Sequence, residues 1–404
     1  MVLKNPQLGV AVLALSAATA TTGNAAETLA DMAPVTLRVA TLYGPDNPLT
    51  DEMEKFTARL EERTDGKLKF DYYYGGSLVP AAELPSGLGS GIFDFGFIMP
   101  AYDSSAFPID EWQGKLAIAT ELDPLLQLLA TGLAGYEWTA NMPEHTAELE
   151  KAGIFPIIPS LSITGTYGVL CKEDNSTYDS MANKRVRVAG ETWTREAQNL
   201  GMIPVSLPVT EVYQAFQGGV IDCWMGSLAD AGEQGFFDHG KYFNLSMGLT
   251  SYAQAVYAFN AGVWNSFPED LKDIIWDETA NFAAGLLIDA GAARQLASAE
   301  IMSRADAHFT IADEDLMSRV NSYHDTVRAG AIDAAPAELS DPAAYVSKLS
   351  DLKVKWNKIL TEEVGVPNQY QSWAEFIDKG GELPRPETFA HIIAREIVSD
   401  QRAN

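Results

Sequence analysis

Short runs of β-branched and aromatic residues alternate with amphipathic segments in the first third of the chain. Residues 35–42 (VTLRVATL) alternate around β-branched positions, which predicts a strand. Apolar residues then recur at helical spacing, which predicts a helix capped by Thr50 and ended by Gly66. A strand over 68–74, a short helix over 81–88 and a buried strand over 92–97 complete a β, α, β, α, β order.

The same order recurs over residues 185–224, with strands over 185–189, 203–207 and 220–224 and helices over 194–200 and 210–217. Residues 90–94 (SGIFD) correspond to residues 218–222 (GGVID), 128 positions later. We expect each to be a helix end, a glycine turn and a buried strand that finishes in Asp. Two such units, linked by strands that cross between them, predict a two-lobed α/β protein. Its ligand cleft should lie at the carboxyl ends of the strands.

Beyond residue 270 the chain is rich in Ala, Leu and charged residues at helical spacing. Residues 280–301 predict one long helix that could lie across both lobes, and the region after Pro367 is expected to be more irregular. We therefore assign residues 33–163 to lobe I, with 252–280 returning to it, and 164–251 to lobe II. Residues 281–404 form a helical region packing on both lobes, and the part after about residue 330 offers a surface for a homodimer.

The N-terminus has the pattern of a secretory signal peptide over residues 1–26. One early cation, Lys4, precedes the apolar run 8–20 and the small residues that end at Ala26. A membrane anchor or a core helix is the alternative, but a spanning helix needs about 20 apolar residues and this run is shorter. The pattern predicts export to the periplasm. Cys171 and Cys223 either pair there or remain two buried thiols, and the sequence leaves both open.

Composition narrows the class of protein further. Hydrophobic residues make up 47% and charged residues 21% of the 404, as in a packed globular chain. The 28 basic and 55 acidic side chains give a net charge of -27, which would repel nucleic acid and anionic lipid surfaces. We expect no nucleic-acid partner and no stable membrane insertion.

Familiar catalytic and cofactor motifs are absent from the sequence. The five histidines are far apart, without HExxH or paired-cysteine spacing, and neither GxSxG nor a Walker A motif occurs. The cluster Gly87-x-Gly89-x-Gly91 lacks the spacing of a dinucleotide-binding loop. We therefore expect no metal and no cofactor. A glycosidase-like carboxylate pair needs no short motif and stays open as an alternative.

Arg187 is unusual because it lies between valines in a hydrophobic strand. Period two places Val186 and Val188 on one face and Arg187 on the other. A guanidinium near a buried strand end needs an anion, and its planar fork can hold a carboxylate bidentately. That anion could equally be a ligand or an Asp or Glu of the chain.

Three segments of the sequence together indicate a resemblance to a known protein family. Residues 184–190 (KRVRVAG), 199–205 (NLGMIPV) and 211–222 (EVYQAFQGGVID), in this order, resemble the solute-binding proteins of tripartite ATP-independent periplasmic (TRAP) transporters. Residues 61–67, 91–94 and 263–268 add to the resemblance. It implies a periplasmic-binding-protein-like fold with a central sheet in each lobe, a cleft at the hinge and a long helix spanning both lobes. It also implies that Arg187 holds the ligand carboxylate.

Departures from the family pattern shape the predicted pocket. Where many members have Asp-Gly-Gln-Glu-Asn-Pro, this chain has residues 222–227 (DCWMGS), so Gly226 and its neighbours replace the usual Asn or Glu contact. The run Trp224-Met225-Gly226 resembles the branch that binds keto acids and other monocarboxylates, in which a tryptophan lines the pocket. That branch often binds a metal through a nearby carboxylate, but the matching stretch around Thr250 has none.

The predicted ligand-binding set combines these residues with aromatic side chains in cleft loops or strand ends, for which core packing is the alternative. It comprises Arg187, Trp224, Met225, Gly226, Thr250, Tyr43, Tyr102 and Tyr167. Asp222 and Glu211 are interpreted as structural. The resemblance predicts a receptor, without enzymatic activity, that binds a small organic acid and delivers it to TRAP membrane permease subunits. An exported α/β enzyme and a binding protein of an ATP-driven importer are the alternatives.

Overall fold

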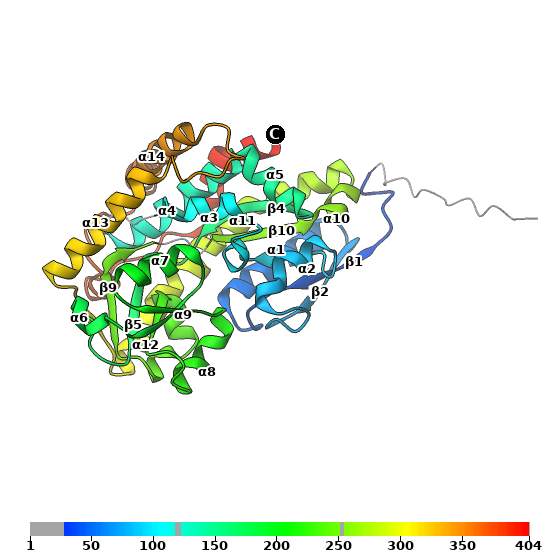
Figure 1. The fold of residues 1–404 in the computed structure, drawn as a ribbon. Coiled ribbons are helices and arrows are strands. Elements are labelled where there is room, and N and C mark those ends of the chain that lie inside the picture. Colours follow the sequence, from blue (N-terminus) through cyan, green and yellow to red (C-terminus); the bar gives the residue numbers. More distant parts are fainter. Residues whose placement is uncertain (1–27, 118–122, 251–253, 404) are drawn as a thin grey trace, which may run out of the picture.

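The computed structural model describes residues 28–117, 123–250 and 254–403, which form two β-sheets with helices packed around them (Figure 1). The predicted signal peptide, residues 1–26, lies outside the described residues. Figure 1 shows β1, β2, α1 and α2 on one side of the molecule and β5, β9, α7 and α8 on the other. This arrangement matches the predicted two-lobed α/β fold. No helix of the described residues is long and apolar enough to cross a membrane.

The first sheet has five strands in the order β2-β1-β3-β10-β4. Strand β1 is parallel to β2 and β3, whereas β10 is antiparallel to β3 and β4. The strands are β1 Val35–Ala40, β2 Leu68–Tyr73, β3 Phe95–Ile98, β4 Ile154–Ser162 and β10 Gln254–Asn260.

The second sheet has six strands in the order β11-β9-β5-β8-β6-β7. They are β5 Tyr167–Cys171, β6 Arg185–Val188, β7 Ile203–Ser206, β8 Cys223–Ser227, β9 Tyr242–Leu249 and β11 His308–Thr310. The chain passes from the first sheet to the second between β4 and β5 and returns between β9 and β10. The predicted crossing strands are therefore present. Strands β4, β5, β9, β10 and β11 were not predicted with bounds, and the three residues of β11 carry too short a pattern.

The helices up to residue 266 surround these sheets. They are α1 Pro48–Arg63, α2 Leu84–Gly89, α3 Pro108–Gly114, α4 Pro124–Ala140, α5 Pro143–Lys151, α6 Tyr178–Met181, α7 Glu191–Asn199, α8 Val212–Gln217, α9 Leu228–Glu233 and α10 Ala261–Ser266. The predicted cap of α1 is wrong: Asn47, and not Thr50, accepts a bond from the amide of Leu49 at 2.9 Å. Pro48 fits directly after this cap, because the first helical position needs no amide donor.

The predicted repeat is confirmed in detail. Arg38 holds Asp94 through its backbone amide, Nε and Nη2, and Arg185 holds Asp222 through the same three atoms. Gly91 and Gly219 both have positive φ, at 75° and 68°.

One detail of the predicted repeat is wrong. Each Asp stands just before its strand, not at its end, because β3 begins at Phe95 and β8 at Cys223. The preceding residues Ile92 and Val220 are 43% and 51% exposed, since they belong to the glycine turn and not to a buried strand. Asp222 is structural, as predicted, and binds Arg185.

The predicted long helix is present as a continuous helical segment from residue 269 to 304. It comprises α11 Glu269–Leu287, a π-helical turn Ile288–Ala292 and α12 Ala293–Arg304. Glu278 of α11 accepts from Arg59 of α1 at 2.7 Å. Arg294 of α12 donates to Glu233 of α9 at 2.6 Å. The segment therefore contacts helices of both sheets.

The C-terminal region packs on its own chain. Its helices are α13 Glu314–Gly330, α14 Pro342–Lys358, α15 Trp373–Asp378, α16 Pro386–Ile393 and α17 Ser399–Ala403, with π-helical turns Ile359–Val364 and Ala394–Val398. Helix α14 contacts α4, and α16 contacts α11. The expectation of an irregular region after Pro367 is wrong, because buried side chains such as Phe376 and Phe389 hold these short helices in place. None of the described contacts supports a homodimer.

One disulfide and one buried carboxylate hold strands and helix ends in place. A disulfide joins Cys171 of β5 to Cys223 of β8, directly opposite each other in the sheet, which answers the question the sequence leaves open. Asp123, 1% exposed, caps α4 by accepting from the amides of Leu125 and Leu126. Its second oxygen accepts from the amides of Gln369 and Tyr370 at 3.1 and 3.0 Å, so it ties the C-terminal region to α4.

Replacing Asp123 with Ala should lower the free energy of unfolding by about 2–4 kcal/mol, because buried amides lose a charged acceptor. Chemical denaturation measures this loss, and hydrogen exchange at residues 369–373 should rise. Asp313→Ala is the control, because Asp313 caps α13 through a single bond at the surface. Its expected loss is about 1 kcal/mol. Equal losses in the two variants would contradict the role given to Asp123.

Candidate functional site

A small pocket lies where the carboxyl ends of strands from the two sheets meet. We call it the Arg187 pocket. Tyr43 follows β1, Met99 and Tyr102 follow β3, and Arg187 lies near the end of β6. Its volume is about 30 Å³, which leaves room for only a water or two. The cleft at the strand ends, expected from the sequence, is therefore present and tightly closed in this conformation.

Arg187 is the charged centre of this pocket. It is 3% exposed, and its Nε donates to the backbone oxygen of Leu207 at 2.7 Å. The valines on either side of it point into the core of the second sheet, as the strand period requires. No carboxylate oxygen in the described part of the chain lies within 4.0 Å of an Arg187 guanidinium nitrogen, the limit for an ion pair. The internal salt bridge, the alternative weighed from the sequence, is not formed.

A second arginine of the pocket, Arg294, has carboxylate partners. It comes from α12 and is 2% exposed. Its Nη2 lies 3.0 Å from Asp230, and its Nε and Nη2 each lie 2.6 Å from Glu233. Glu233 also accepts from Asn47 Nδ2 at 3.0 Å, which joins the loop after β1 to α9. The charge of Arg294 is therefore neutralised inside the protein, in contrast to that of Arg187.

Three predicted tyrosines line the same pocket. Burial raises the pKa of Tyr43, Tyr102 and Tyr167, so their hydroxyl groups stay protonated and can donate hydrogen bonds. The Tyr102 hydroxyl also accepts from the amide of Val209 at 3.3 Å. Tyr167 stacks on Trp193 with ring centroids 5.3 Å apart. The pocket thus combines one unpaired cation with hydroxyl donors and apolar walls.

The structure brings together four of the eight predicted ligand-binding residues: Arg187, Tyr43, Tyr102 and Tyr167. The other four do not line the pocket. Trp224 is fully buried with its ring 5.0 Å from that of Phe236, and it covers Gly226, where an added Cβ would lie 2.1 Å from the indole. Met225 is 1% exposed in the core. The direct roles assigned to these residues stay predictions.

Thr250 is held in a separate buried network. Its hydroxyl and amide bond to Glu196 at 2.7 and 3.0 Å, and His324 Nε2 lies 3.0 Å from the same carboxylate oxygen. These bonds attach α13 to α7. Thr250 therefore serves the packing of the C-terminal region on the second sheet.

Sequence reasoning missed Arg294 and Asp230. Arg294 stands in an alanine-rich helical stretch, and a cation among small apolar residues is the same signal that singled out Arg187. Asp230 gave no signal, because acidic side chains are abundant in this chain. It lies in the first turn of α9, where its Oδ2 accepts from the hydroxyl of Ser227, the N-cap residue of the helix, at 3.0 Å.

Three polar contacts hold the elements around the pocket together. Besides Asn47–Glu233 and Tyr102–Val209, the Thr192 hydroxyl of α7 donates to Glu111 of α3 at 2.8 Å. Burial raises the pKa of Glu111 to about 7, against its ordinary value of 4.5. No group of three or more potential metal ligands occurs among the described residues.

The two-lobed α/β fold and its pocket can now be compared with known proteins, beginning with their sequences. Residues 172–322 match the model of the bacterial extracellular solute-binding proteins, family 7. A solute-binding protein of Sulfitobacter sp. (strain NAS-14.1) is 24% identical over 245 residues, which are 60% of this chain and 71% of that protein. One from Albidiferax ferrireducens is 23% identical over 272 residues, 63% of this chain and 75% of the relative.

Solved structures share the fold at low sequence identity. A TRAP periplasmic solute-binding protein from Desulfovibrio salexigens with bound orotic acid has a TM-score of 0.66 and 19% identity, covering 78% of this chain and 99% of its own. A Bordetella pertussis extracytoplasmic solute receptor binding pyroglutamic acid has a TM-score of 0.66 and 16% identity, covering 80% of this chain and 100% of its own. The resemblance to TRAP solute-binding proteins that the sequence motifs indicate is therefore confirmed.

Arg294→Met should lower the free energy of unfolding by about 3–5 kcal/mol, because it leaves the carboxylates of Asp230 and Glu233 without their cation. Arg304→Met on the same helix is the control, since Arg304 is exposed and forms only a surface pair with Glu300. Its expected change is within about 0.5 kcal/mol. Denaturant unfolding compares the two, and an unchanged stability of Arg294→Met would refute the paired role.

The raised pKa of Glu111 makes stability depend on pH. Between pH 4.5 and about 7 the folded protein keeps a proton on Glu111 that the unfolded chain has lost. The contribution of Glu111 to the free energy of unfolding therefore falls as pH rises, by up to about 1.4 kcal/mol per pH unit. Glu111→Gln should flatten the pH profile of the free energy of unfolding, whereas Glu150→Gln at the surface should leave it unchanged. Parallel profiles for wild type and Glu111→Gln would show that Glu111 titrates normally.

Proposed function

We propose that this protein is a receptor that binds one small organic acid between its lobes, with the ligand carboxylate on Arg187. The observation that carries the proposal is a buried guanidinium with no carboxylate partner among the residues that the structure describes, next to a second buried arginine that has two. An unpaired charge in the interior is costly unless an anion neutralises it. A ligand that brings its own carboxylate supplies that anion.

The geometry of Arg187 suits one carboxylate. Its Nε donates to the Leu207 carbonyl, which fixes the plane of the guanidinium, and the side chain lines the pocket. The tyrosine hydroxyls can donate to further oxygens of the ligand, and Asp230 can accept from a hydroxyl or N–H group. The relatives described above bind orotic acid and pyroglutamic acid, and a Sulfitobacter relative binds β-D-galacturonate, all of them organic acids.

Binding requires the lobes to move apart and close again. The Arg187 pocket has a volume of about 30 Å³, smaller than any of these acids. We propose lobe I as residues 33–163 with 252–280 and lobe II as residues 164–251, moving about the two chain crossings. The ligand stabilises the closed state to the extent that it binds this state more tightly.

The match to a solute-binding family supports a proposal for the physiological setting. We propose that the chain is exported, loses residues 1–26 and works in the periplasm, where it delivers its acid to TRAP membrane subunits in transport driven by an ion gradient. The matched family consists of solute-binding receptors and not of an enzyme class. We propose that the bound acid is released unchanged.

Thermal unfolding against a panel of carboxylates and sulfonates tests the proposal. A ligand at about 100 times its dissociation constant adds roughly 2.7 kcal/mol of stability, which raises the melting temperature of a chain this long by about 3 °C. Arg187→Met should abolish this shift. Arg185→Met is the matched control, because Arg185 lies on the same strand but is half-exposed and bonded to Asp222.

Two outcomes would contradict the proposal. If Arg187→Met responds to the same acid as strongly as the wild type, the carboxylate is not held by Arg187. If an acid from the panel is converted to product during incubation, as followed by proton NMR, the exported-enzyme alternative replaces the receptor.

A further inference from the structure

A second cavity lies behind the wall of the Arg187 pocket, and we call it the rear cavity. It has a volume of about 550 Å³, within the range of about 300–1,000 Å³ typical of small-molecule sites. It is formed where α4, β9, β11, α12 and the segment before α15 meet. The two cavities share no lining residue.

The wall between the two cavities is thin. Thr166 faces the rear cavity and the next residue, Tyr167, faces the Arg187 pocket. In the same way, Gln295 faces the rear cavity and the preceding residue, Arg294, faces the Arg187 pocket. The Gln295 side-chain amide donates to the backbone oxygen of Thr164, a residue of the Arg187 pocket, so this bond lies within the wall.

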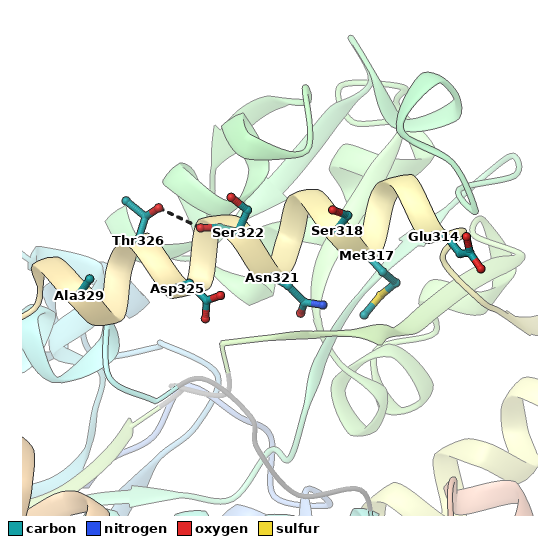
Figure 2. A pocket seen from close by; sticks show the side chains of 8 residues that line it. All are labelled: Glu314, Met317, Ser318, Asn321, Ser322, Asp325, Thr326 and Ala329. Atoms are coloured by element: carbon teal, nitrogen blue, oxygen red, sulfur yellow. Dashed lines mark hydrogen bonds between the residues drawn. The ribbon is translucent and has the colours of Figure 1, made fainter.

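None of the fourteen described residues that line the rear cavity is charged, although the chain has 55 acidic and 28 basic side chains. Leu228, Leu245, Phe309 and Trp373 give apolar walls, and Trp373 is only 6% exposed. By contrast, the hollow along α13 shown in Figure 2 is lined by one helix alone and carries the carboxylates of Glu314 and Asp325. An ion in the rear cavity would find no counter-charge among the described lining residues, whereas an uncharged molecule loses little on leaving water.

One buried polar group of the rear cavity lacks a partner. Gln127 is 2% exposed, and its Oε1 accepts a bond from the Thr166 hydroxyl. Its Nε2 has no hydrogen-bond partner within the described part of the chain. Buried amide donors are nearly always satisfied, so this one is suited to an acceptor brought by a ligand.

We propose that the rear cavity is a second binding site, for an uncharged molecule with an apolar ring or chain and one carbonyl or hydroxyl acceptor for Gln127. The apolar part lies against Trp373 and Phe309, and the acceptor meets Gln127 Nε2. The site is separate from the proposed acid site, because the two cavities share no lining residue. Its ligand differs in class from the organic acid of the Arg187 pocket.

Matched probes test this site. 4-Phenylbutanamide has the required ring and carbonyl without charge, and 4-phenylbutanoate is its anionic counterpart. Isothermal titration calorimetry with the purified full-length protein should show the amide binding at least tenfold more tightly than the acid. Quenching or a shift of tryptophan fluorescence, lost in Trp373→Phe, should accompany binding of the amide.

Variants locate the probe. Leu245→Trp, which fills the cavity, should abolish amide binding, and Gln127→Leu should weaken it about tenfold through the lost hydrogen bond. Arg187→Met should leave amide binding unchanged, which separates this site from the acid site. Circular dichroism and thermal unfolding establish that each variant is folded.

Three results would overturn the proposal. No binding of either this amide or its shorter homologue 3-phenylpropanamide at millimolar concentration would show that the rear cavity is not a ligand site. Amide binding that survives in folded Leu245→Trp, or that disappears in Arg187→Met, would place the probe elsewhere. Failure of the acid experiment alone leaves this proposal standing, because the two sites are read out by different compounds and variants.

Discussion

The candidate site depends on the buried guanidinium of Arg187, whose positive charge has no carboxylate partner among the described residues. Its orientation is fixed by the Leu207 carbonyl, a neutral partner that satisfies one donor without neutralising the charge. Arg294, equally buried and in the same pocket, is neutralised by two carboxylates. Folding thus provides carboxylate partners for Arg294, and we propose that the ligand supplies one for Arg187. A chain with a net charge of -27 can then still attract an anion, because the local cation dominates over distant charges that salt screens.

The fold supports this imbalance through its internal repeat. The Arg38–Asp94 and Arg185–Asp222 pairs close equivalent turns in the two sheets and leave the carboxyl ends of the neighbouring strands free for the pocket. The disulfide between Cys171 and Cys223 joins β5 to β8 beside the strand that carries Arg187. The segment α11–α12 then brings Arg294 to the pocket while α11 remains bound to α1. The proposed closure of the lobes would therefore act on a pre-formed set of side chains.

Much of this arrangement could be predicted from the sequence, because strand period and glycine turns are local signals. The six predicted strands, the repeat and the position of Arg187 follow from them. The orientation of Trp224 could not be predicted, since it depends on Phe236 and Gly226 packing around the indole. Arg294 was missed because only the folded chain brings residue 294 next to residue 230. The rear cavity likewise could not be predicted from the sequence, because its described walls come from seven separate segments of the chain.

The structure of a complex with a stabilising acid tests the central claim most directly. The account predicts that the two carboxylate oxygens lie about 2.7–2.9 Å from the terminal nitrogens of Arg187, with the Nε bond to Leu207 retained. It also predicts that Arg294 remains bonded to Asp230 and Glu233. A carboxylate bound to Arg294, with Arg187 still unpaired, would contradict the claim that folding leaves Arg187 for the ligand.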